Sequence, residues 1–66
     1  MSDDNLNYYV KLLDEQIELV NREKEIVLSG KPLESILRDL KKIQFEYKKI
    51  SNSLITVYRM LQEISD

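Results

Sequence analysis

The chain has 66 residues, a net charge of −2, and neither cysteine nor histidine. A chain this short buries only ~60% of the surface that its unfolded form exposes. Without cysteine and histidine, neither a disulfide nor an ordinary zinc or haem site can add stability. We therefore expect the chain to be stabilised by association with another chain. With one glycine, one proline and 42% hydrophobic residues, the composition excludes intrinsic disorder and favours helices. Because no apolar run approaches the ~20 residues of a membrane span, we expect a cytoplasmic protein with no membrane contact.

The first half of the chain predicts a helix from about Asp4 to Ser29. Apolar residues recur there at alternating spacings of four and three, which is the pattern of a helix that packs along one line against a partner helix. The predicted line consists of Leu6, Val10, Leu13, Ile17, Val20, Lys24 and Val27. Lys24 is its only charged member, and we expect its alkyl stem to lie along the partner helix while its ammonium group reaches water.

A turn is predicted at Ser29–Pro32, within the segment VLSGKPLES. Gly30 can end the first helix in the left-handed conformation, and Pro32 can open the next helix because its φ is already fixed near the helical value. The rest of the chain contains no comparable combination of glycine and proline. The sequence therefore predicts one helical hairpin.

The second helix is predicted from about Pro32 to Ser65, with the same apolar spacing. Its line consists of Leu33, Ile36, Leu40, Ile43, Tyr47, Ile50, Leu54, Val57, Leu61 and Ile64. Folding the chain back at the turn places Val10 opposite Ile50 and Leu6 opposite Leu54, in a continuous antiparallel register. The predicted fold is all-α: a single helical-hairpin domain over residues 1–66.

Some apolar residues have no partner in this hairpin. The first helix carries a second apolar line, and the second helix extends past the start of the first, so we expect two hairpins to associate into an antiparallel four-helix bundle. The candidate residues of the dimer interface are Tyr9, Leu12, Leu19, Ile26, Val57 and Leu61.

The sequence offers little for catalysis. The segment SGK at 29–31 lacks the first glycine and the preceding strand of a phosphate-binding loop, and the acidic pairs of the first helix fall on outward positions, where a solvated surface is the ordinary role. We expect no enzyme activity, no catalytic or metal-binding residue and no cofactor.

Charge is unevenly distributed, because residues 1–30 carry a net charge of −4 and residues 31–66 a net charge of +2. Phe45, the only phenylalanine, lies amid the basic residues of the second helix. Such a surface can bind an anionic partner, with the bases providing attraction and the ring an anchor; alternatively, Phe45 packs against a neighbouring subunit and the lysines only keep the bundle soluble. The candidate partner-binding residues are Arg38, Lys41, Lys42, Phe45, Lys48, Lys49, Tyr58, Leu61 and Ile64.

Two resemblances extend these expectations. The turn SGKPLES, residues 29–35, resembles that of the small subunit of bacterial exonuclease VII, which implies an accessory subunit of a larger enzyme. The expected bundle is similar in architecture to the plasmid copy-number regulator Rop, which implies nucleic-acid binding through one helical face. Small hairpins of viruses, phages and secretion systems serve as adaptors. The expected function is a homodimeric adaptor or regulator acting on an unidentified protein partner, with a nucleic-acid-binding regulator and an accessory subunit as alternatives.

Overall fold

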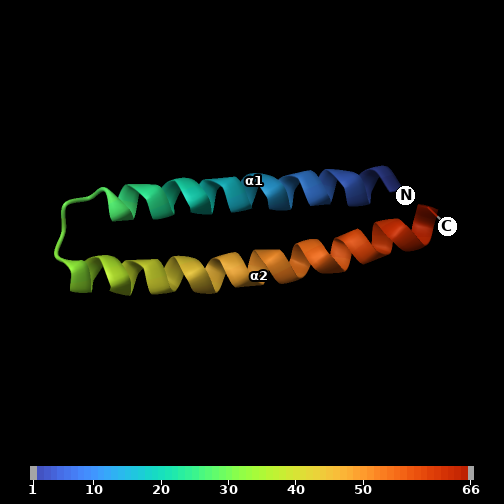
Figure 1. The fold of residues 1–66 in the computed structure, drawn as a ribbon. Helices are drawn as coiled ribbons and strands as arrows, with labels where there is room; N and C mark the ends of the chain where they lie inside the picture. Colours follow the sequence, from blue (N-terminus) through green and yellow to red (C-terminus); the bar gives the residue numbers. More distant parts are fainter. Residues whose placement is uncertain (1, 66) are drawn as a thin grey trace.

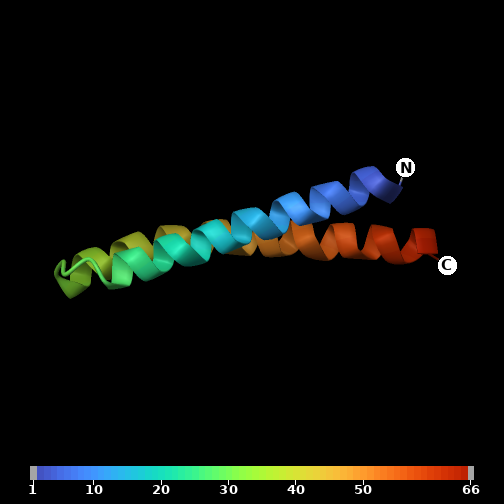
Figure 2. The same cartoon turned by 90° about the horizontal axis from the view of Figure 1, so that it is seen from above.

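The computed structural model describes residues 2–65, with the side chains of residues 4–63, and consists of two helices. Helix α1 comprises Ser2–Val27 and helix α2 comprises Leu33–Ser65. They lie antiparallel and pack against each other, so that the two ends of the chain meet at the same end of the molecule (Figures 1 and 2). The molecule extends 51 Å along its long axis and only 15 × 12 Å across it. The prediction of an all-helical hairpin is confirmed.

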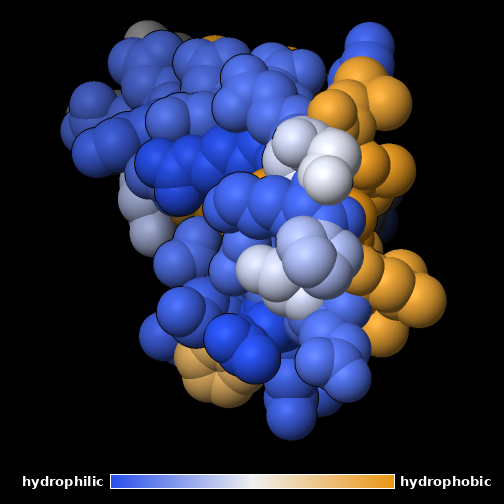
Figure 3. Space-filling view, turned by 90° about the vertical axis from the view of Figure 1, so that its left-hand side faces the viewer, coloured by the Kyte–Doolittle hydropathy of each residue, from blue (hydrophilic) through white to orange (hydrophobic). Residues whose placement is uncertain are grey.

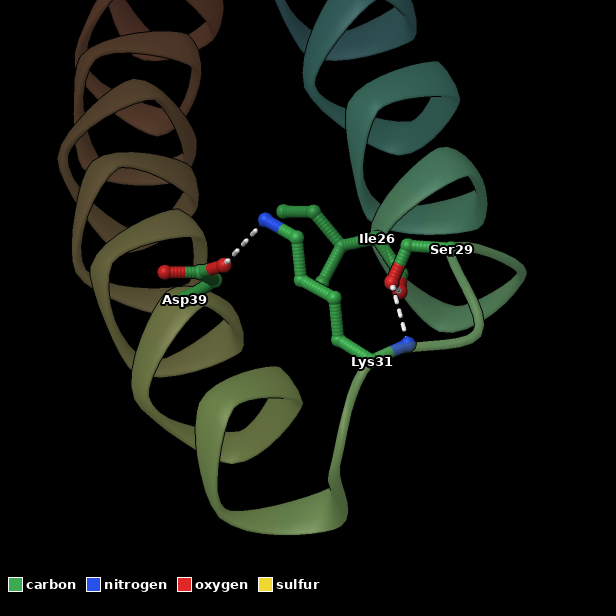
Figure 4. A network of polar contacts seen from close by, with 4 residues as sticks. All are labelled: Ile26, Ser29, Lys31 and Asp39. Atoms are coloured by element: carbon green, nitrogen blue, oxygen red, sulfur yellow. Dashed lines mark hydrogen bonds and ion pairs between the residues drawn. The ribbon is translucent and has the colours of Figure 1, made fainter.

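The connection between the helices contains the predicted turn residues, although α1 ends two residues before Ser29 and α2 begins just after Pro32. Gly30 has a φ of 75°, the left-handed conformation expected of a residue that ends a helix. The Ile26 carbonyl accepts a hydrogen bond of 2.7 Å from Ser29 Oγ, and this oxygen in turn accepts one of 3.4 Å from the Lys31 backbone N–H (Figure 4). These bonds satisfy groups that the end of α1 leaves without helical partners.

Helix α2 presents to α1 the line of apolar residues that its spacing predicts. Ile43, Leu54 and Val57 are buried, and their neighbours along this line are half-buried: Ile36, Leu40, Ile50 and Leu61. Leu33, at the start of the line, is exposed. Tyr47, in the middle of the line, is also exposed, and the side chain of Ile64 lies outside the described residues. The prediction for this helix therefore holds for Ile36–Leu61 except at Tyr47.

Helix α1 presents a different line from the predicted one, so the prediction for this helix is wrong. Leu12 and Leu19 are buried, and Tyr9 and Ile26 are half-buried. The predicted line is exposed to solvent at every position: Leu6, Val10, Leu13, Ile17, Val20, Lys24 and Val27. The two lines are one residue apart, and one residue is a rotation of ~100° about the helix axis. The predicted and observed orientations of α1 therefore differ by a rotation of ~100° about its own axis.

The register between the helices differs as well. Leu12 packs with Leu54 and Val57, whereas the predicted register placed Leu54 opposite Leu6, about two helical turns away on α1. Tyr9 also packs against this core cluster. Val57 is consequently only 4% exposed, and the expected overhang of α2 is covered by the first turns of α1. This register buries apolar surface that the predicted one leaves in water.

Candidate interaction surfaces

One side of α1 carries a row of exposed aliphatic side chains. We name as the α1 stripe the residues Leu6, Val10, Leu13, Ile17, Val20 and Val27. Their spacing of four and three is interrupted only at Lys24, and the most exposed of them, Ile17, has 58% of its surface accessible. An isolated hairpin leaves this row in water, although its spacing is suited to packing against another helix.

Helix α2 adds its own exposed apolar residues to the same side of the hairpin. These are Leu33, Leu37, Tyr47, Ile55 and Tyr58. The α1 stripe lies about 100° from the buried line of its helix, and the members of the α2 row lie roughly 35–115° from theirs, in the same rotational sense along the chain. Because the helices are antiparallel, both rows lie on the same side of the hairpin. Val20 and Tyr47 accordingly line one shallow depression across the helices. Seen along the molecule from its turn end, hydrophobic side chains form a continuous column along one side that spans both helices, with only smaller hydrophobic areas elsewhere (Figure 3). We name the two rows together the apolar face.

The apolar face is large for so small a molecule. At the exposures given by the structure, its side chains carry on the order of 1,000 Å² of accessible surface, above the few hundred Å² of the largest patch on a typical monomer. A standard protein–protein interface takes about 800 Å² from each partner. The apolar face therefore carries as much accessible surface as one partner contributes to an interface of standard size.

A second surface lies on the side of α2 that faces away from α1. Its basic residues are Arg38, Lys41, Lys42, Lys48 and Lys49, all exposed. Phe45 stands at their centre and is 63% exposed. Most of these side chains line one open depression around Phe45, and the Lys49 ammonium lies 4.9 Å from the centre of the ring, in the range of a cation–π interaction. We name these six residues the basic face.

The acidic neighbours of the basic face neutralise little of its charge. Asp39 is half-buried and pairs instead with Lys31 from the turn, at 3.8 Å (Figure 4). Glu46 shares the depression around Phe45, but it forms no ion pair with a basic residue within the described part of the chain. The five cations are therefore available to an external anion.

Some of the candidate residues from the sequence lie on the surface of the hairpin, and others lie between its two helices. The basic residues and Phe45 come together as expected, and Tyr58 is exposed on the apolar face. Leu61 instead packs against the core of the hairpin, and the side chain of Ile64 lies outside the described residues. The candidate dimer residues are buried or half-buried between the two helices of one chain: Tyr9, Leu12, Leu19, Ile26, Val57 and Leu61.

Sequence reasoning missed the contribution of α2 to the apolar face. Leu37 and Ile55 were not selected, because both lie off the regular line of this helix. The helical period could have identified them, because residues placed ~100° apart put Leu37 and Ile55 on the same side of α2 as Tyr58.

Other kinds of site find no support in the residues that the structure describes. No group of three acidic side chains in this part of the chain is arranged to hold a metal ion, and neither helix, over its described length, combines the length and hydropathy needed to cross a membrane. No protein-family model matches the sequence, and no curated protein or solved structure is significantly similar to it.

Proposed function

We propose that this chain is a non-enzymatic, homodimeric four-helix-bundle protein that acts as an adaptor or regulator through contacts with other proteins. The observation that carries the proposal is the apolar face, which unites exposed rows from both helices on one side. The occupant best suited to such a surface is a second copy of the same chain, because its own two rows each run along most of one helix and so have similar length.

The stability of the chain gives independent support. Only five hydrophobic side chains of the described residues are buried: Leu12, Leu19, Ile43, Leu54 and Val57. A core of this size supplies little free energy of folding. Covering the apolar face would add the buried surface that the isolated hairpin lacks, so folding and association reinforce each other.

The experiment is sedimentation velocity on the purified protein at micromolar concentration, where we expect a dimer. Val20→Asp places a carboxylate within the apolar face and should convert the dimer to monomers. The matched control is Asn21→Asp, which introduces the same group at the adjacent exposed position outside the apolar face. A native protein that sediments as a monomer would refute the proposal and assign the apolar face to a different chain, as in an accessory subunit of a larger enzyme.

A second candidate function is nucleic-acid binding through the basic face. The specific observation in its favour is the combination of five basic side chains, none in an ion pair within the described residues, with a largely exposed aromatic ring. Basic groups that follow a phosphate backbone, together with a ring on which a base can stack, are the usual components of single-strand binding.

Salt dependence tests this second candidate. Binding to a short single-stranded RNA or DNA should weaken steeply as salt rises, because each phosphate contact releases a counterion. Lys41→Glu with Lys42→Glu should abolish it, and Lys11→Glu, which changes an exposed base of α1, should leave it nearly unchanged. If the protein does not retard either nucleic acid at low salt, the basic face binds something other than nucleic acid.

A further inference from the structure

The two long edges of the apolar face carry opposite charges. Along α1 the exposed residues just beyond the α1 stripe include three acids and one base: Asp14, Glu18, Glu25 and Lys11. Along α2 those just beyond the apolar row include three bases and one acid: Lys41, Lys48, Arg59 and Glu34. At ~100° per residue, these side chains lie on the outer side of each row, away from the partner helix of the hairpin. The apolar face is therefore bordered by an acidic edge on α1 and a basic edge on α2.

Two hairpins can cover each other's apolar faces in two symmetric ways. If the twofold axis runs parallel to the helices, α1 packs on α2 of the second copy, and both turns lie at the same end of the bundle. If the axis runs across the helices, α1 packs on α1 and α2 on α2, and the turns lie at opposite ends. Both satisfy the self-complementarity that a twofold interface requires.

We infer that the second copy docks with its turn at the same end, so that the acidic edge of α1 meets the basic edge of α2 of the other copy. This inference rests on the proposed homodimer and adds the subunit arrangement to it. With the turns at opposite ends, acidic edge would meet acidic edge and basic would meet basic, and like charges placed together disfavour association. Opposite edges in contact favour it and fix the orientation.

The heights of the residues along the hairpin agree with this arrangement. An axis parallel to the helices keeps each residue at its own height, so α1 meets α2 of the second copy in the same register as it meets its own α2. Glu23 is hydrogen-bonded to Gln44, at 2.9 Å, which places Glu25 close to the height of Lys41. Glu25 and Lys41 of the second copy are therefore placed to face each other across the edge.

The apolar rows match in the same way. Val20 and Tyr47 line one depression, and Tyr9 shares another with Ile55 and Tyr58. In the inferred arrangement, Val20 meets Tyr47 of the second copy, and Val10, which follows Tyr9, meets Ile55 and Tyr58 of the second copy. Apolar residues thus face apolar residues at both ends of the interface.

Spin labels measure the arrangement directly, because the chain contains no cysteine of its own. A label on Glu34→Cys, in the first turn of α2, reports the position of the turn. In the inferred arrangement the two α2 helices lie diagonally across the bundle, and neighbouring helices of a bundle are 8–10 Å apart. We therefore expect a distance of at most about 25 Å between the two labels. With turns at opposite ends the distance would be roughly 45 Å, from the rise of 1.5 Å per residue. A long distance in a sedimenting dimer would overturn the arrangement and leave the dimer itself intact.

Asn52→Cys is the matched control for the label, because this exposed position lies near the middle of the paired helices and gives a short distance in both arrangements. A monomer by sedimentation, with no dipolar coupling at either position, would refute the dimer and with it the arrangement.

Charge reversal provides an independent measurement. Asp14→Lys with Glu25→Lys makes both edges basic, and Lys41→Glu with Lys48→Glu makes both edges acidic, so each pair should weaken self-association about tenfold at low salt. All four substitutions in one chain give the two edges opposite charges again and should restore the native affinity. If neither pair weakens the dimer, the edges are not in contact as inferred.

Discussion

Glu23 of α1 accepts a hydrogen bond of 2.9 Å from Gln44 Nε2 of α2, across the interface between the two helices. This bond connects residues that are 21 positions apart in the chain. It therefore records the register in which the two helices meet, at the end of the hairpin nearer the turn.

We predict that Gln44→Glu destabilises the hairpin by roughly 0.5–1 kcal/mol, because it replaces the donor with a second carboxylate beside Glu23. The measurement is urea unfolding followed by circular dichroism, at fixed protein concentration. The loss should shrink at high salt, since the site is solvent-exposed and like charges there are screened. Asn52→Asp is the control, as it adds the same charge at an exposed position farther along α2. Equal losses in both variants would contradict the role of the bond.

Adjacent leucines distinguish the two sides of α1. Leu12 is 5% exposed and packs with Leu54 and Val57, whereas Leu13 is 37% exposed on the α1 stripe. Leu12→Ala should cost about 2–5 kcal/mol through lost packing and the cavity left behind, enough to unfold much of so small a domain. Leu13→Ala should mainly weaken the dimer.

Helical content by circular dichroism and mass by sedimentation separate these two effects. The predicted result is a loss of helix for Leu12→Ala and a shift toward monomer, with the helix retained at high protein concentration, for Leu13→Ala. The opposite outcome would restore the assignment that the sequence alone suggested.

The turn depends on the left-handed backbone of Gly30. A Cβ at this position would meet no neighbouring atom within 4 Å, so the cost of Gly30→Ala comes from the φ of 75° alone. We expect about 1–2 kcal/mol, seen as a fall of several degrees in the midpoint of thermal unfolding. Gly30→Asn should cost less, because asparagine adopts this conformation more readily than alanine. A fully neutral alanine variant would contradict the structure of the turn.

Lys24 interrupts the α1 stripe, where its neighbours in the row are Val20 and Val27. Lys24→Leu should tighten the dimer, by about tenfold or more, because it replaces a charge within the interface by buried apolar surface. A dilution series in sedimentation equilibrium measures the change. The control is Lys42→Leu, which changes an exposed lysine of α2 that lies outside the apolar face and its two edges and should leave the dimer affinity unchanged. Equal effects of the two variants would indicate that general hydrophobicity, and not the position of Lys24, governs association.

Phe45 lies outside the inferred dimer interface, on the side of α2 that carries the basic face. Phe45→Ala should therefore leave the dimer affinity unchanged and lower the stability by less than about 1 kcal/mol, the value of the exposed contact with Lys49. Sedimentation and thermal unfolding measure both quantities. A marked loss of dimer would instead place Phe45 against the second copy.

Much of the fold follows from local features of the sequence. The glycine–proline pair at Gly30 and Pro32 defines one turn, and the spacing of apolar residues defines a helix on each side. The line of α2 that faces α1 was also predictable between Ile36 and Leu61, except at the exposed Tyr47, because this helix has one dominant apolar line. The clustering of Phe45 with Arg38 and the lysines required only the helical period.

The orientation of α1 could not be obtained in this way. Two apolar lines, one through Leu12 and Leu19 and the other through Leu13 and Val20, run along this helix one residue apart, and each has the spacing that a partner helix requires. Spacing favours the line that the structure exposes, because this line is interrupted only at Lys24, whereas Gln16 and Glu23 interrupt the buried line. A shift of about two turns changes the partners while preserving the periodicity.

The sequence by itself determined two helices, one turn and more apolar residues than two helices bury between them. Only the tertiary structure decided which of the apolar residues of α1 are buried and which are exposed. Packing Leu12 and Tyr9 against Leu54 and Val57 covers the far end of α2, which the alternative register would leave in water. Burial is a property of both helices together, so the choice between the two apolar lines of α1 depends on contacts between residues that are distant in the sequence.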